Sequence, residues 1–339
     1  MNLWIALLAA VSLASDGSPV ERAAEQILGH QADDGAIVMG ALPANRSHLI
    51  PYCANFSARG LVAAFGGTHE PRYLDAAKRW AAWYEAHMNA DGTIDDFNGS
   101  PGAWSPTGDY DSTDSYAATY LDLVLAIHRA APDREWLRSR LPSARQAVAA
   151  IRLTLQPNGL TIAKAKWSVM YVMDNTETVA GLRAAEGIAR ELGEAAFQRE
   201  TGAMADKMEQ AISRELWNDA RQAYDIGLQT NGAKVHGKPA WYPYLMANLM
   251  AAGWLPSSER HRALLVSLKE QFPGDIPTAV RAESDLDHLV WWGIAARGAG
   301  DRALSADIAA KLAAFDTSVK KFANPGLLGH LCRLLAQQQ

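Results

Sequence analysis

The sequence has 339 residues, 49% of them hydrophobic and 20% charged, a composition typical of a folded globular chain and unlike that of a disordered one. The formal net charge is −5 at pH 7, and no Lys/Arg-rich run is present, which argues against nucleic-acid binding. Two cysteines, Cys53 and Cys332, are too few for a disulfide framework or a four-thiolate zinc site.

The chain begins with an apolar segment, Leu3–Leu13 (LWIALLAAVSL). A bilayer span needs about 20 apolar residues, so this segment is too short to cross a membrane. Its length is typical of the core of a signal peptide, and Ser12 and Ala14 are small residues suited to cleavage before Ser15. We expect residues 1–14 to be a signal peptide, although no Lys or Arg precedes the apolar core; an uncleaved apolar helix is the alternative. The mature protein is then expected in the periplasm or outside the cell, with no stable membrane insertion.

Helical periodicity recurs along the rest of the chain, and runs of alternating β-branched residues are nearly absent. Capping residues and Gly/Pro breakers divide the pattern into twelve predicted helices. Their cores are 20–29, 52–65, 73–88, 113–130, 136–155, 175–191, 195–216, 242–252, 258–272, 285–296, 303–315 and 324–336.

The links between these helices alternate in length, and the helices alternate in character. Each even-numbered helix is followed by a short link, and each odd-numbered helix by a longer one rich in Gly, Asp, Asn and aromatic residues. Even helices, such as 117–127 (AATYLDLVLAI), are apolar nearly all round and should be buried, whereas odd ones are amphipathic. This pattern predicts an all-α fold: six hairpins forming an (α/α)6 toroid, one domain over 15–339, with the long loops on one rim. A linear solenoid is the structural alternative.

Closure of the toroid would make the first and last inner helices neighbours. These helices carry Cys53 and Cys332. We therefore predict a disulfide, or at least proximity, between the two thiols.

Acidic and aromatic residues gather where the long links enter the even helices. The candidate catalytic carboxylates are Asp111 and Asp114 in GDYDSTDSY, Asp174 and Glu177 in MDNTE, and Asp285 in ESDLDH. The candidate substrate-binding residues on the same rim are Trp104, Tyr110, Trp167, Tyr171, Trp241, Tyr242, His236 and His288. Paired carboxylates in an aromatic-lined pit suit glycoside hydrolysis, because one acid protonates the leaving oxygen while another activates water or attacks the anomeric carbon. The alternative for each single carboxylate is a helix cap. No histidine pair has metal-ligand spacing, so we expect no metal and no cofactor.

Three segments carry a family resemblance: GDYDSTDSYAATYL (108–121), MDNTETVAGL (173–182) and WYPYLMANLM (241–250). Set on twelve helices, they resemble bacterial members of the six-hairpin glycosidase superfamily. The resemblance implies an (α/α)6 barrel with catalytic acids at the starts of inner helices. Asp174 is similar in placement to the general acid/base of the unsaturated glucuronyl hydrolases, and Asp111 or Asp114 would then be the facing carboxylate. Glu177 and Asp285 are reserves for these roles.

The sequence thus predicts a secreted or periplasmic glycoside hydrolase acting on an oligo- or polysaccharide. Two other classes of function remain open. A sugar epimerase or polysaccharide lyase on the same toroid would use His236, His288 or Tyr242 in place of paired carboxylates. A non-catalytic glycan-binding protein would keep the aromatic residues and not depend on either acid.

Overall fold

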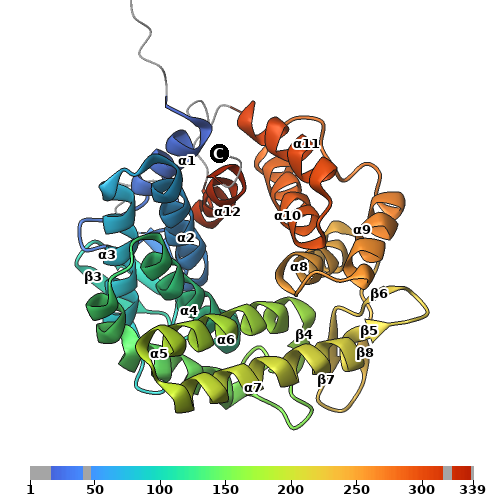
Figure 1. Ribbon diagram of the computed structural model, residues 1–339, viewed down its shortest axis with the longest axis horizontal. Helices are drawn as coiled ribbons and strands as arrows, with labels where there is room; N and C mark the ends of the chain where they lie inside the picture. The colour runs from blue at the N-terminus through green and yellow to red at the C-terminus, as the bar shows by residue number, and fades with distance from the viewer. Residues whose placement is uncertain (1–16, 41–46, 316–322, 337–339) are drawn as a thin grey trace, which may run out of the picture.

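The computed structural model describes residues 17–40, 47–315 and 323–336, and these form two concentric rings of helices (Figure 1). The inner ring consists of α2 (Pro51–Thr68), α4 (Thr113–Ala130), α6 (Val172–Leu192), α8 (Met246–Trp254), α10 (Glu283–Ala299) and α12 (Pro325–Ala336). The outer ring consists of α1 (Pro19–Leu28), α3 (Pro71–His87), α5 (Arg134–Thr154), α7 (Ala195–Ala211), α9 (Glu259–Gln271) and α11 (Arg302–Ala313).

The ring is closed. Each inner helix packs against the next one, and α12 packs against α2 to complete the circle. The predicted (α/α)6 toroid is therefore confirmed, and the linear alternative is wrong. Among the described residues, no helix combines the length and the apolar character that a membrane span requires. The expected signal peptide, residues 1–14, lies outside the described residues.

The burial of each helix follows its sequence pattern. In α4 every side chain from Thr113 to His128 is buried except the half-buried Asp122. In α5, by contrast, a single stripe that includes Leu137, Ala147 and Ile151 faces inward. A helix that is apolar on all sides needs neighbours on all sides, which only the inner ring provides.

Short strands occupy the long links, and the sequence pattern did not predict them. They are β1 (Ser47–Leu49), β2 (Phe97–Ser100), β3 (Ala103–Pro106), β4 (Val169–Tyr171), β5 (Trp217–Asn218), β6 (Ala223–Tyr224), β7 (Gly227–Gln229) and β8 (Lys234–Val235). They form three antiparallel sheets, ordered β1-β2-β3, β4-β7-β8 and β5-β6. Each sheet lies in links that run into inner helices, so the sheets gather on one rim of the toroid.

The start of the eighth helix differs from the prediction in its backbone conformation. The helix expected from Tyr242 begins as a π-helical segment, Trp241–Leu245, and α8 proper starts at Met246. Tyr242 itself has extended backbone angles (φ −116°, ψ 137°). It precedes Pro243, whose ring disfavours helical angles in the preceding residue.

The closing contact between α2 and α12 brings the two backbones together. A Cβ atom on Gly329 would lie 2.0 Å from the carbonyl oxygen of Phe56, and one on Gly326 would lie 3.0 Å from that of Cys53. Cys332 follows Gly326 by six residues, which is about 9 Å along the helix, and its Sγ instead lies 3.8 Å from the Val20 carbonyl oxygen. Both thiols are free, so the predicted disulfide is wrong, although the helices that carry the cysteines are neighbours as expected.

Candidate active site

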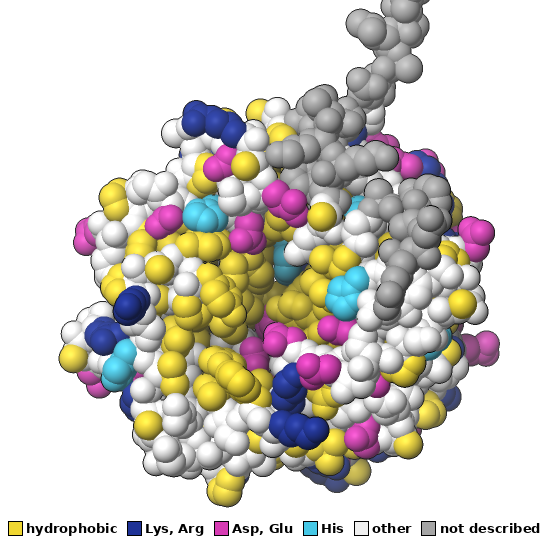
Figure 2. All heavy atoms as spheres, turned by 180° about the vertical axis from the view of Figure 1, so that it is seen from behind, with side chains coloured by type: hydrophobic (Ala, Val, Ile, Leu, Met, Phe, Trp, Pro, Cys, Tyr) yellow, Lys and Arg dark blue, Asp and Glu magenta, His cyan; other side chains and the backbone are white. Residues whose placement is uncertain are grey.

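A cavity of about 860 Å³ opens at the centre of the rim that carries the long links. Figure 2 shows this face, with a central hollow bordered by hydrophobic side chains and by a group of acidic ones. The volume lies within the range of roughly 300–1,000 Å³ that is usual for ligand pockets. The lining residues come from all six inner helices or from the links that lead into them.

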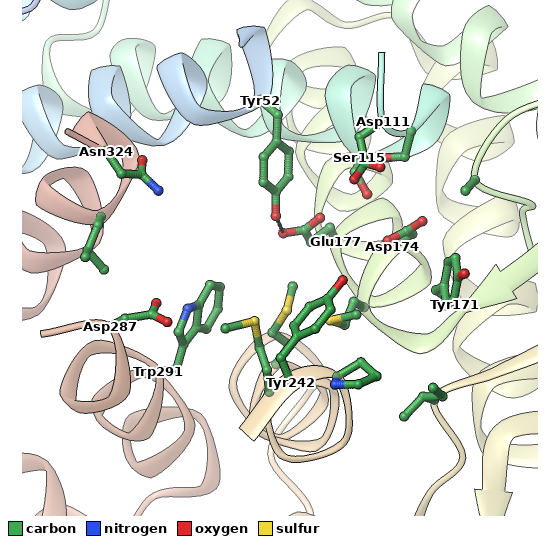
Figure 3. A pocket seen from close by; sticks show the side chains of 18 of the residues that line it. Tyr52, Asp111, Ser115, Tyr171, Asp174, Glu177, Tyr242, Asp287, Trp291 and Asn324 are labelled. Carbon is green, nitrogen blue, oxygen red and sulfur yellow. Dashed lines mark hydrogen bonds between the residues drawn. The ribbon is translucent and has the colours of Figure 1, made fainter. Parts of the chain in front are cut away.

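One wall of the cavity is acidic. Asp111 precedes α4, and Asp174 and Glu177 lie one turn apart near the start of α6, so their side chains share a helix face (Figure 3). All three line the cavity. The structure therefore brings together three of the five carboxylates that the sequence singled out.

Glu177 is the deepest of the three, with 2% of its surface exposed. The hydroxyl of Tyr52 donates to its Oε1 at 2.7 Å. Burial raises the pKa of Glu177 to about 8; the hydrogen bond from Tyr52 opposes this shift, and the charges of Asp114 and Asp111 reinforce it. At neutral pH this carboxyl group is mostly protonated.

Asp114 lies behind the wall and does not line the cavity. Its side chain is fully buried, and its Oδ1 accepts the backbone N–H of Ser115 at 3.0 Å. Burial raises the pKa of Asp114 despite its hydrogen bonds. Burial also holds the pKa of the half-buried Asp174 well above its usual range, and the charges of Asp114, Glu177 and Asp111 add to that effect. Asp174 is thus a carboxyl group at the cavity surface whose surroundings favour its protonated form.

Asp111 is exposed, and a hydrogen-bonded chain fixes the loop that carries it. Its backbone N–H donates to the Tyr116 hydroxyl at 3.4 Å, and that hydroxyl donates to Oδ1 of Asp96 at 2.9 Å. The backbone N–H of Asp96 in turn donates to the carbonyl of Asp109 at 2.9 Å. The position of Asp111 therefore depends on α4 and on the strand link before it.

A second polar wall faces the acidic one (Figure 3). It carries Asp287 and Trp291 of α10 and Asn324 at the start of α12. Nε1–H of Trp241 donates to Oδ2 of Asp287 at 3.3 Å, and the Trp241 ring stacks on His288 with centroids 3.6 Å apart. Burial raises the pKa of Asp287, while the Trp241 hydrogen bond lowers it.

Three of the predicted substrate-binding aromatics line the cavity: Trp167, Tyr171 and Tyr242. Nε1–H of Trp167 donates to the hydroxyl of Tyr171 at 2.9 Å, which fixes the two rings relative to each other. Trp167 and Tyr242 are 53% and 65% exposed, so they stand at the mouth of the cavity.

The other predicted site residues on the rim do not line the cavity. Asp285 caps α10, where its Oδ2 accepts the backbone N–H groups of Arg281 and Ala282 at 2.8 and 3.0 Å. Trp104 donates to Asp34, Tyr110 accepts a hydrogen bond from Thr113, His236 pairs with the buried Asp225, and His288 stacks on Trp241. These residues support the rim or, like Trp241, hold a cavity residue in place.

In the described parts of the chain, no group of three or more His, Cys, Asp or Glu side chains is placed to hold a metal ion.

No protein-family model matches the sequence, and no curated protein matches it. Solved structures do match the fold. A GH63 mannosylglycerate hydrolase from Thermus thermophilus, in complex with glucose, superposes with a TM-score of 0.69 at 13% identity, over 94% of this chain and 99% of that one. A rhamnosidase from Klebsiella oxytoca with rhamnose bound gives 0.63 at 12% identity, over 96% of this chain and 65% of that one. A glycosidase in complex with glucose gives 0.61 at 14% identity, over 94% and 95% of the two chains.

The chain has the six-hairpin glycosidase fold.

Within this six-hairpin fold, sequence reasoning missed several cavity residues: Tyr52, Ser115, Asp287, Trp291 and Asn324. A usable signal existed on α10. Glu283, Asp287 and Trp291 are spaced by four residues, so they lie on one helix face, and all three line the cavity. Asp285 lies about 200° around the helix from Asp287 and cannot share that face.

Proposed function

We propose that the protein is a glycoside hydrolase whose general acid is Asp174. One observation carries this proposal: Asp174 lines a sugar-sized cavity, and its surroundings hold its pKa well above the usual range. A general acid must be protonated near the working pH and must reach the leaving oxygen. The neighbours with the same fold are described as glycoside hydrolases, which supports the assignment of a reaction class.

Asp111 is the favoured second carboxylate. The sequence analysis named Asp111 and Asp114 as candidates for the second carboxylate. Asp114 has no surface in the cavity, whereas Asp111 is exposed and lies on the same wall of the cavity as Asp174. Asp287 on the opposite wall is the rival. Glycosidases whose carboxyl groups are about 5–5.5 Å apart retain anomeric configuration, and those about 6.5–9.5 Å apart invert it. The anomer of the product therefore reports how far the partner carboxyl group lies from Asp174 in the working enzyme.

We also propose that the protein is exported. The basis is the apolar segment Leu3–Leu13 followed by small residues before Ser15. An extracytoplasmic glycosidase would meet oligo- or polysaccharides outside the cell. N-terminal sequencing of the protein from culture supernatant or periplasm would test this, and a chain that begins at Ser15 is the expected result.

The decisive experiment is hydrolysis of a broad oligosaccharide panel by the wild type and by Asp174→Asn. Loss of a general acid lowers the rate by about 10²–10⁴. The melting temperature should stay the same or rise, because the substitution removes a half-buried carboxyl group from among like charges. Asp75→Asn, at an exposed position on α3, is the matched control and should keep full activity.

Other outcomes point to other functions. Bound sugar that neither protein cleaves would contradict hydrolysis and indicate a glycan-binding protein. Isomerised or unsaturated products would indicate an epimerase or a lyase. When hydrolysis is found, the effects of Asp111→Asn and Asp287→Asn identify the second carboxylate, and the product anomer shows whether configuration is retained or inverted.

A further inference from the structure

The floor between the two polar walls is apolar and rich in methionine. Met246 and Met250 lie one turn apart on α8 and present the same helix face, and Met173 joins them from α6. Ile226 and Val235, from the link that carries β7 and β8, extend the floor. Figure 3 shows sulfur-bearing side chains around the Tyr242 ring, below Glu177 and Asp174 in this view. We call this set of five residues the methionine floor.

The methionine floor is poorly suited to a sugar ring. A pyranose carries hydroxyl groups around its edge, and these need hydrogen-bond donors and acceptors when they leave water. A thioether donates no hydrogen bond and accepts only weakly, and aliphatic side chains do neither. Methionine does, however, adapt its shape to apolar partners, which is why it is frequent on surfaces that bind varied hydrophobic groups.

The floor also begins beside the proposed acid. Met173 is the chain neighbour of Asp174, and Tyr242, whose ring borders the floor, is close enough to Asp174 and Asp111 to feel their charges. A leaving-group oxygen protonated by Asp174 would therefore carry its substituent toward the floor. At the mouth, the exposed rings of Trp167 and Tyr242 continue the apolar surface outward.

We propose that the methionine floor binds an apolar aglycone, an alkyl or aryl group linked to the sugar that occupies the acidic wall. The inference rests on the proposed hydrolase function and adds the substrate class: glycosides of hydrophobic alcohols or phenols. The two polar walls supply hydrogen bonds for the sugar, and the floor supplies the apolar surface for its substituent.

The test measures binding of alkyl glucosides and alkyl mannosides, each as both anomers. In each series the alkyl chain lengthens from methyl through butyl to hexyl. Calorimetry on Asp174→Asn, with the wild type beside it, gives affinities without interference from turnover. Transfer of one methylene group from water to an apolar site strengthens binding about fourfold. We expect the dissociation constant to fall by about that factor per methylene until the floor is covered. An affinity that does not depend on chain length, or no binding of any hexyl glycoside, would overturn the proposal.

Substitutions in the floor locate the effect. Met246→Gln and Met173→Gln change half-buried side chains of similar size, and both should flatten the dependence of affinity on chain length. Met204→Gln, at a half-buried position on α7 away from the cavity, is the control and should leave it unchanged. If the floor variants bind hexyl glycosides as the control does, the floor is not the binding surface.

Parallel hydrolysis assays separate this inference from the proposed function. Chain-length-dependent binding without cleavage of any glycoside would keep the apolar site and reject the hydrolase. Cleavage with equal affinity for methyl and hexyl glycosides would keep the hydrolase and reject the apolar site.

Discussion

Folding buries Glu177, and burial disfavours the ionised form of its side chain. Its pKa rises from 4.5 to about 8, so the folded state holds this proton more tightly than the unfolded state. Folding is therefore favoured while the group is protonated in both states, and stability falls as the pH rises from about 4.5 through about 8.

Glu177→Gln should remove this dependence on pH. The amide stays neutral and can still accept the Tyr52 hydroxyl hydrogen bond, so the variant should gain a few kcal/mol over the wild type between pH 5 and pH 9. Urea unfolding at several pH values measures the difference. A constant difference across that range would mean that Glu177 ionises in the folded protein as it does in the unfolded chain.

Asp114 acts on the site through its charge and not by contact with substrate. Its charge disfavours ionisation of Asp174, so its removal should lower the pKa of Asp174. Asp114→Asn should therefore shift the alkaline limb of the pH–activity profile to lower pH and leave the maximal rate nearly unchanged. Its amide oxygen can still accept the Ser115 N–H.

The control for this variant is Asp225→Asn, a buried carboxylate that pairs with His236 and does not itself line the cavity, which should not move the alkaline limb. A lower maximal rate at an unshifted limb would show that Asp114 contributes directly to the reaction.

Sequence reasoning at this scale found the acidic wall because Asp111, Asp174 and Glu177 stand at the starts of two recognisable helices. It chose Asp285 on α10, although the structure uses that residue as a cap and directs Asp287 into the cavity. The helical period separates those two residues. Asp114 is buried because α4 packs against the link before α6. The sequence of either segment alone does not reveal this packing.

At the scale of elements, helix positions were predictable because their apolar periodicity is long and because several outer helices, such as α1 and α5, begin at a capping side chain. The predicted helix 113–130 coincides with α4. The strands were not predictable, because segments of two to four residues have no periodicity of their own and depend on pairing with distant segments, as β4 does with β7. The late start of α8 was readable in principle, because Tyr242 precedes Pro243.

The contact between α2 and α12 predicts a contrast between two glycines. Gly329→Ala would place a Cβ atom 2.0 Å from the backbone oxygen of Phe56, so the helices must move apart, and such overpacking costs about 1–3 kcal/mol or more. Gly66, also in α2, has open space where its Cβ would lie. Gly66→Ala should be neutral or stabilise by about 0.5–1 kcal/mol, because alanine is the better helix former.

Thermal and urea unfolding of the two variants measure this contrast directly. Equal stability of Gly329→Ala and Gly66→Ala would contradict the close backbone contact between the first and last inner helices.

At the scale of the whole molecule, closure distinguishes this protein from a linear helical array. In such an array each repeat contacts only its neighbours, and loss of a terminal repeat lowers stability by a limited increment. Here α12 contacts α1, α2 and α10, so the last helix of the chain joins both ends of the ring. The sequence predicted this closure from the alternation of helix character. It did not predict the offset between Cys53 and Cys332, which depends on how far α12 slides along α2.

A chain that ends before Pro325 should therefore lose far more than one helix of stability. Without α12, the apolar faces of α1, α2 and α10 that now contact it would be exposed, and the cavity lining would lose Leu327. We expect this truncated chain to bind a hydrophobic dye and to lack a single cooperative unfolding transition. A chain that ends after Ala336, which keeps α12, is the control and should unfold cooperatively. Near-UV circular dichroism during urea unfolding measures the cooperativity. The opposite outcome is that the shorter chain unfolds in one cooperative transition, with a denaturant slope reduced only in proportion to the residues removed. That result would mean that closure of the ring adds no stability beyond that of a linear helical array.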